Sequence, residues 1–140
     1  MKYTIYVMLA LLGLAQLLQV EYSNPKSDKN LEIQTPKEIK TILKRACYDC
    51  HSNETVWPWY SKIAPLSWSI VDHVEDGRAW VNYSIWYSYT KEEQSKKLKE
   101  TFRAIYAAMP PSSYIRFHDA ANLTKEERKF VRDWIKNFQQ

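Results

Sequence analysis

The sequence predicts a small all-α domain of about four helices, preceded by an N-terminal hydrophobic helix. Capping boxes, in which a threonine is followed three residues later by glutamate, precede apolar stripes at helical spacing. No segment shows the convincing alternation of polar and apolar residues that indicates a strand. Only 2 of the 140 residues are glycines, which disfavours an architecture built on tight glycine turns.

The expected helices of the domain begin at recognisable signals. Capping boxes at Thr35, Thr90 and Thr124 mark three starts, each followed by an amphipathic stretch. A fourth helix is expected between Pro65 and Gly77. Gly77 can adopt the left-handed conformation that commonly ends a helix.

The N-terminal residues differ in kind from the rest. Residues 3–20, "YTIYVMLALLGLAQLLQV", carry no charge. As a helix they would rise about 27 Å, close to the hydrocarbon thickness of a bilayer. Residues 1–20 are therefore expected to form a membrane anchor, with a secretory signal cleaved near residues 13–15 as the alternative. A buried core helix is a third possibility, disfavoured because the stretch is apolar all round.

The remainder of the chain divides into a tether and one domain. Residues 21–34, "EYSNPKSDKNLEIQ", are polar and lack periodicity, which indicates a tether. Residues 35–140 have the length and composition of one globular domain. The net charge of +4 lacks the clustered basic patches of a nucleic-acid-binding surface. A nucleic-acid partner is therefore not expected.

The segment "CYDCH" contains the two cysteines of the chain, Cys47 and Cys50, followed at once by His51. Cysteines three residues apart on a helical turn project from one face. From there two thiols can reach the two vinyl groups at one edge of a porphyrin, and the adjacent histidine can reach the iron. This spacing is typical of c-type haem attachment. We therefore expect one covalent haem c per chain.

Three other interpretations of the motif fit the sequence less well. A disulfide between the cysteines would close a very small loop and leave His51 without a purpose. A thioredoxin-like redox pair requires a βαβ setting, which the pattern does not indicate. A structural zinc site needs four ligands, and only His73 and His118 could complete it, without zinc-finger spacing.

A c-type haem usually takes a second axial ligand, and Met109 is the favoured candidate. It stands at the expected end of a helix and is followed by Pro110 and Pro111, which stiffen the next segment. A role as core filler is the alternative for Met109. His118 is the second candidate, whereas His73 is expected on the surface. His51 and Met109 together would give a higher potential than two histidines.

Two segments resemble a known family. "CYDCHSNETVWPWYSKIAP" and "MPPSSYIRFHDAANLT" are similar to the small monohaem haem-binding domain proteins, bacterial relatives of cytochrome c. The resemblance covers about residues 35–138. It implies a cytochrome c-like helical fold around one haem, attached through Cys47 and Cys50. His51 would be the proximal ligand and Met109 the distal one.

Further residues are expected around the haem. Trp59 or Tyr60 should border the ring or a propionate, because broad side chains cover its flat apolar surface. The alternative is that these aromatic side chains only cap the helical core. Tyr114 and Arg116, just past the Met-Pro-Pro turn, could bind a propionate, with Arg78 as a weaker candidate.

The imidazole of His51 also needs an acceptor for its Nδ1–H, which fixes the tautomer. A proline carbonyl does this in related cytochromes, and Pro65 is the candidate here, ahead of Pro58.

The sequence thus indicates a membrane-tethered periplasmic cytochrome that carries single electrons between redox partner proteins. Its expected place is the periplasmic side of a bacterial inner membrane, or the soluble periplasm if the leader is cleaved. One alternative is a haem-based sensor or peroxidase with a labile sixth ligand. Another is an accessory haem subunit of a respiratory or oxidoreductase complex.

Overall fold

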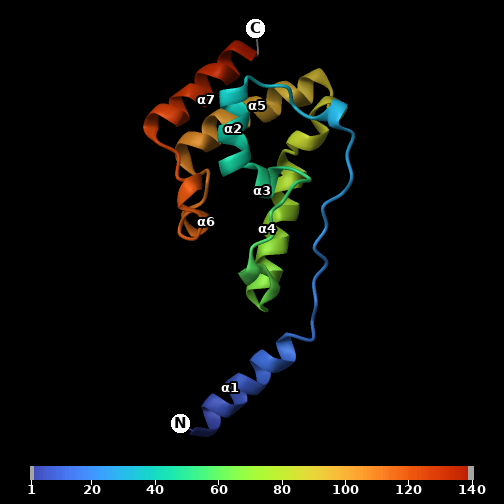
Figure 1. Cartoon of the computed structure of the whole chain (residues 1–140), viewed down its shortest axis with the longest axis vertical. Coiled ribbons are helices and arrows are strands. Elements are labelled where there is room, and N and C mark those ends of the chain that lie inside the picture. Colours follow the sequence, from blue (N-terminus) through green and yellow to red (C-terminus); the bar gives the residue numbers. More distant parts are fainter. Residues whose placement is uncertain (1, 139–140) are drawn as a thin grey trace.

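The chain folds into helices throughout the part described by this computed structural model, residues 2–138 (Figure 1). These residues contain seven α-helices, four short 3-10 helices and no strand. The α-helices are α1 (Lys2–Ala15), α2 (Lys37–Ala46), α3 (Tyr48–His51), α4 (Leu66–Trp80), α5 (Lys91–Ala107), α6 (Ser112–Ile115) and α7 (Lys125–Phe138). The 3-10 helices are η1 (Lys29–Leu31), η2 (Trp59–Lys62), η3 (Tyr83–Ser88) and η4 (Asp119–Ala121).

The all-helical character is confirmed, but the expected number of about four helices is wrong. The additional α-helices α3 and α6 have four residues each and carry no capping box for the sequence pattern to reveal. Met1 and residues 139–140, which the predicted first and last segments include, lie outside the described residues.

Helix α1 extends away from the packed helices (Figure 1). It ends at Ala15, so it is shorter than the expected helix through residue 20. None of the helices in residues 2–138 combines the length and apolarity that crossing a bilayer requires. The predicted membrane anchor of residues 1–20, and the location that depended on tethering by it, are therefore wrong.

Two of the three predicted capping boxes are formed. The Thr90 hydroxyl accepts the amide of Glu93 at 3.2 Å, and the Glu93 carboxylate accepts the Thr90 amide at 2.8 Å. Thr124 and Glu127 make the same reciprocal pair at 3.1 and 2.9 Å. Thr35 does not cap α2, because its hydroxyl donates to the neighbouring carbonyl instead.

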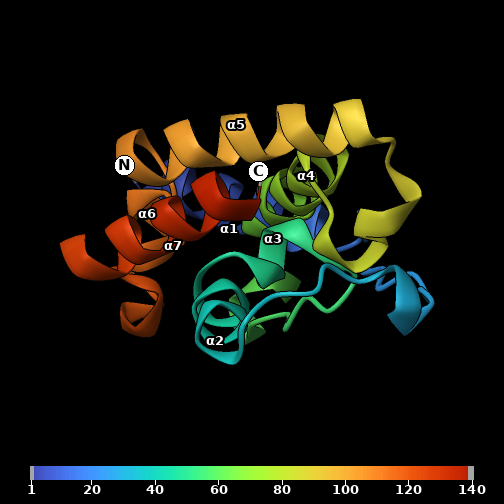
Figure 2. The ribbon, with the colours of Figure 1, turned by 90° about the horizontal axis from the view of Figure 1, so that it is seen from above.

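Helices α2, α5 and α7 enclose the main core. Figure 2 shows α5 lying across one side of the molecule, with α7 next to it and α2 on the other side. Helix α7 packs against both α5 and α2. Burying each large apolar side chain here contributes about 1.5–3 kcal/mol before the entropy of ordering it is subtracted. Among the fully buried members are Ile39, Leu43, Trp86, Leu98, Val131 and Ile135.

The segment between α1 and α2, predicted as a polar tether, lies extended beside α4 (Figure 1). The Arg78 guanidinium on α4 donates to the carbonyl of Ser23 and the side-chain oxygen of Asn24, each at 2.8 Å. Just after α1, the Gln16 amide pairs with the backbone of Ala64, donating at 2.9 Å and accepting at 3.0 Å. Side-chain hydrogen bonds therefore hold this segment against the helical domain.

Candidate functional site

The two cysteines lie on one short helical turn. The amide of Cys47 donates to Leu43 at the end of α2, at 2.8 Å. The amides of Cys50 and His51 then both donate to the Cys47 carbonyl, at 3.2 and 2.9 Å. This turn brings the two thiols and the imidazole to the wall of one cavity.

The cavity has a volume of about 290 Å³ and a mainly apolar lining. Helices α2, α3, α4 and α5 and the segment before α6 supply its walls. Four of the predicted site residues meet there, since Cys47, Cys50, His51 and Met109 all line it. The other lining residues include Leu43, Ala46, Trp80, Val81, Tyr83, Ala104 and Ile105.

The imidazole of His51 is held in one tautomer. Its Nδ1 lies 2.8 Å from the carbonyl oxygen of Gly77 and 3.1 Å from that of Val81. Because both neighbours are acceptors, Nδ1 carries the proton and Nε2 keeps its lone pair. Burial lowers the pKa of His51, so the ring is neutral at neutral pH. Nε2 makes no hydrogen bond to the described residues and is free to bind a metal.

Gly77 allows α4 to cross α3 at very short range. A Cβ atom at this position would lie 2.4 Å from the Cys50 carbonyl oxygen and 3.1 Å from the Cys50 Cβ. The prediction that Gly77 ends its helix in a left-handed conformation is wrong, because α4 continues past it. Gly77 also takes the acceptor role predicted for Pro65, whose carbonyl binds the amide of Trp68 at 3.2 Å instead.

Both cysteines are free thiols in the structure, so the disulfide interpretation is not supported. Burial is the main cause that raises the pKa of Cys47 to about 12 and that of Cys50 to about 11. Both groups therefore stay protonated at neutral pH, which disfavours a preformed thiolate site for zinc. Within residues 2–138, no cluster of three or more His, Cys, Asp or Glu side chains could hold a metal ion.

The first residue between the cysteines, Tyr48, anchors the motif to the core. Its ring stacks on Tyr83 with the centroids 5.8 Å apart. Its hydroxyl donates to the Glu32 carboxylate at 2.9 Å and accepts from the Lys40 ammonium at 2.7 Å. Lys40 and Glu32 also form an ion pair with an N–O distance of 2.5 Å. This polar network ties the motif to the segment before α2.

The second intervening residue, Asp49, connects the motif to two other segments. One carboxylate oxygen accepts the Val56 amide at 3.0 Å, and the other accepts the Tyr114 hydroxyl at 2.6 Å. Tyr114 was expected to bind a haem propionate. It lines the cavity, but its hydroxyl is engaged by Asp49, and its ring stacks on His118 at 4.0 Å.

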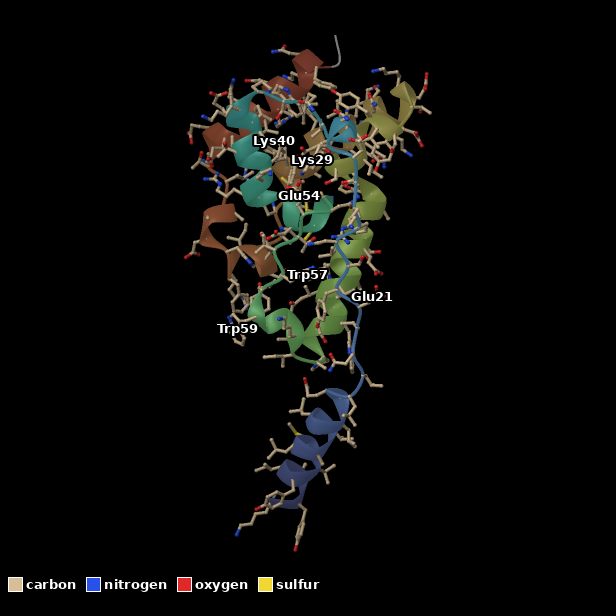
Figure 3. The ribbon with its side chains drawn as sticks, turned by 45° about the vertical axis from the view of Figure 1, so that its right-hand side comes forward. Glu21, Lys29, Lys40, Glu54, Trp57 and Trp59 are labelled. Atoms are coloured by element: carbon tan, nitrogen blue, oxygen red, sulfur yellow. The ribbon has the colours of Figure 1, made fainter. Side chains whose placement is uncertain are left out.

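Glu54 lies outside the cavity and ties the loop after α3 to η1 and α2 through two ion pairs. The Glu54 carboxylate, in the loop after α3, binds the ammonium groups of Lys29 and Lys44, the latter at 3.0 Å. Figure 3 shows Lys29 and Glu54 lying close together beside the motif helix. Both lysines are half-exposed or more, so these pairs contribute about 1 kcal/mol or less each.

Several predicted residues do not line the cavity. Trp59 is 77% exposed and points outward (Figure 3), while Tyr60 and Pro65 lie outside the lining. His118 also lies outside the lining, behind Tyr114. His73, expected on the surface, is exposed at the cavity wall, with its Nδ1 2.6 Å from the Ser69 carbonyl.

The cavity is apolar and is lined by two thiols, a neutral imidazole and a thioether. Such a lining in a small helical protein suits a large apolar metal cofactor. The model of the haem-binding domain family matches residues 10–137, and the chain belongs to this family. It is therefore a haem protein. The match also includes the segment before residue 35. No curated protein and no solved structure matches the chain.

The lining residues fit a haem. The orphaned Nε2 of His51 offers the ligand that haem iron commonly takes. The thioether of Met109 and the thiols of Cys47 and Cys50 line the same cavity. The broad faces of Trp80 and Tyr83 add apolar surface that a porphyrin could cover.

Proposed function

We propose that this haem protein is a monohaem c-type cytochrome that carries single electrons between redox partner proteins. Cys47 and Cys50 would hold the haem covalently, and His51 and Met109 would bind its iron. The observation that carries this proposal is that all four side chains line one apolar cavity while Nε2 of His51 is left free.

The chain's own residues prepare the proximal ligand. The carbonyls of Gly77 and Val81 accept the Nδ1 proton of His51, which fixes the ring orientation and raises the basicity of Nε2. The haem supplies reversible one-electron chemistry at its iron when bound. The apolar walls keep water away and, together with the thioether of Met109, favour a raised potential.

If His51 and Met109 both bind the iron, no coordination position would be left for a substrate. The protein would then transfer electrons without binding or converting a small molecule at the metal. This feature separates the carrier from the sensor or peroxidase alternative, which needs a vacant or labile position.

Covalent attachment is tested by replacing Cys47 and Cys50 with alanine and expressing the protein together with a cytochrome c maturation apparatus. We expect complete loss of haem stain on a denaturing gel, and a pyridine haemochrome spectrum of the c type in the unsubstituted protein. His73→Ala is the matched control and should keep the stain. Persistent stain in the double cysteine variant would contradict the proposed thioether bonds.

The distal ligand is tested by Met109→Ala. The absorption band at the red end of the ferric spectrum, which reports thioether ligation, should disappear. The midpoint potential should fall, and the ferrous protein should bind carbon monoxide. His118→Ala should change none of these properties. An unchanged spectrum in Met109→Ala would refute the ligation, and carbon monoxide binding by the unsubstituted protein would favour the sensor or peroxidase.

A further inference from the structure

The residues from 109 to 114, here called the distal segment, carry Met109 at the cavity wall. Pro110 is buried and Tyr114 packs against the core. Met109 itself is half-buried, and Ser112 and Ser113 are exposed. The Met109 amide donates to the Ala104 carbonyl at 2.9 Å, which ties the start of the segment to the last turn of α5. Side chains from other parts of the chain add hydrogen bonds at both ends of this stretch.

Arg128 of α7 holds the beginning of the distal segment. Its Nη1 donates to the carbonyl of Met109 at 2.5 Å and to that of Ile105 as well. Its Nε lies 3.3 Å from the carbonyl of Leu123. The last carbonyls of a helix lack intrahelical partners, and a cation near them is favourable. Arg128 therefore caps α5 and fixes the backbone of Met109 at the same time.

Tyr114 holds the other end. Its hydroxyl donates to the carboxylate of Asp49 at 2.6 Å, which is a short, charge-assisted hydrogen bond. Asp49 lies between the two cysteines of the motif, so this single bond connects the proximal side of the cavity directly to the distal side. The Tyr114 ring also stacks on His118, with the centroids 4.0 Å apart, which fixes its direction.

We propose that Arg128 and the Asp49–Tyr114 pair form a two-ended clasp that positions Met109 over the cavity and excludes small external ligands from the iron. None of the three side chains is a ligand in the proposed function, so they act as positioning residues. The inference rests on the Met109 ligation proposed above.

The proposal is tested with the full-length holoprotein in four variants: Arg128→Met, Arg128→Lys, Tyr114→Phe and the double variant of Arg128→Met with Tyr114→Phe. Tyr114→Phe keeps the ring and removes only the hydroxyl. Arg128→Lys keeps the charge but not the fork of donors. Arg103→Met and Tyr87→Phe are matched controls, because both side chains are exposed and lie outside the cavity lining.

Two readouts are measured. Amide hydrogen exchange across residues 109–118 should speed up on the order of tenfold in Arg128→Met and in Tyr114→Phe, because one charge-assisted hydrogen bond contributes roughly that factor. The double variant should show a larger increase than either single variant. The ferric band of thioether ligation should weaken and carbon monoxide should gain access, with covalent haem unchanged and Arg128→Lys intermediate. The control variants should match the unsubstituted protein in both readouts.

The outcomes separate this clasp from the ligation on which it rests. If the unsubstituted protein lacks the thioether band, the ligation is wrong and this role of the clasp falls with it. If that band is present and survives in Arg128→Met, Tyr114→Phe and their combination, the clasp alone is overturned. Unchanged exchange across residues 109–118 in these variants would likewise overturn the clasp.

Discussion

The side of the cavity that carries His51, here called proximal, and the side that carries Met109, here called distal, are held in place by different kinds of interaction. On the proximal side, α4 crosses the motif helix α3 so closely that no Cβ atom fits at Gly77, and backbone carbonyls orient His51. On the distal side, Met109 lies on a short segment that hydrogen bonds from the side chains of Arg128 and Tyr114 hold at its two ends. Steric contact along a backbone fixes the proximal wall, whereas separate polar bonds fix the distal one. The proximal wall should therefore fail together with the fold, and the distal side should loosen one bond at a time.

The largest loss of stability is expected from Gly77→Ala, which would place a methyl group 2.4 Å from the Cys50 carbonyl oxygen. Helices α3 and α4 must then separate, at a cost of about 3 kcal/mol. Chemical denaturation should show this loss, together with reduced haem incorporation. Gly13→Ala is the control, since nothing lies within 4 Å of its added methyl group. Equal stability of the two variants would show that the proximal wall is not fixed by steric contact.

The next effect is expected from Arg78→Met on α4. This guanidinium donates to Ser52 and Thr55 as well as to the extended segment, each at 2.8 Å. Removing it leaves partly buried acceptors unpaired and should cost about 2 kcal/mol. Limited proteolysis should then cut between residues 20 and 28 faster than in Arg103→Met. A protected segment would mean that the other hydrogen bonds suffice to hold it.

Tyr48→Phe should have a smaller effect on the proximal wall. The phenyl ring can still stack on Tyr83, but the hydroxyl bonds to Glu32 and Lys40 are lost. The lysine and glutamate stay paired with each other, which limits the cost to about 1 kcal/mol. Thermal unfolding measures this loss, and the haem spectrum should stay unchanged. A changed spectrum would place the hydroxyl network nearer to the cofactor than the structure indicates.

The smallest expected change in stability is its pH dependence, which His51 should cause. Burial lowers the pKa of His51 below its ordinary value of 6.5, so the unfolded chain binds this proton more readily than the folded one. Stability contributed by the neutral ring is complete above pH 6.5 and is lost as the pH falls below it. In the haem-free protein, the free energy of unfolding should therefore decrease as the pH falls below about 6.5. His51→Gln should show a flatter profile there, and parallel profiles would remove His51 as the cause.

Much of the site could be predicted because its chemistry depends on residues adjacent in the sequence. Cys47, Cys50 and His51 share one helical turn, so their spacing alone brings them together. Met109 was a candidate because few residue types bind haem iron and because prolines follow it, and the structure places it in the cavity lining. The capping boxes at Thr90 and Thr124 are equally local, and the structure forms both.

The remaining parts depend on contacts between distant segments, which local patterns do not encode. The Gly77 contact requires knowing that α4 crosses α3, although the scarcity of glycine was a signal that each one could matter. Arg128 and Asp49 look like ordinary surface charges until α7 and α6 are placed beside α5 and the motif. Trp59 was expected at the haem because it is broad and apolar, yet the turn of η2 directs it to solvent.

The pairing of Gln16 with Ala64 has a consequence for motion. A free linker of fourteen residues would let the domain wander over roughly 20 Å around the end of α1. Here the chain is fastened just after α1, again at Tyr22, whose hydroxyl donates to Ser61 at 2.6 Å, and again at Asn24. The domain therefore does not move freely relative to α1. The side of the domain that faces α1 is therefore set by these hydrogen bonds.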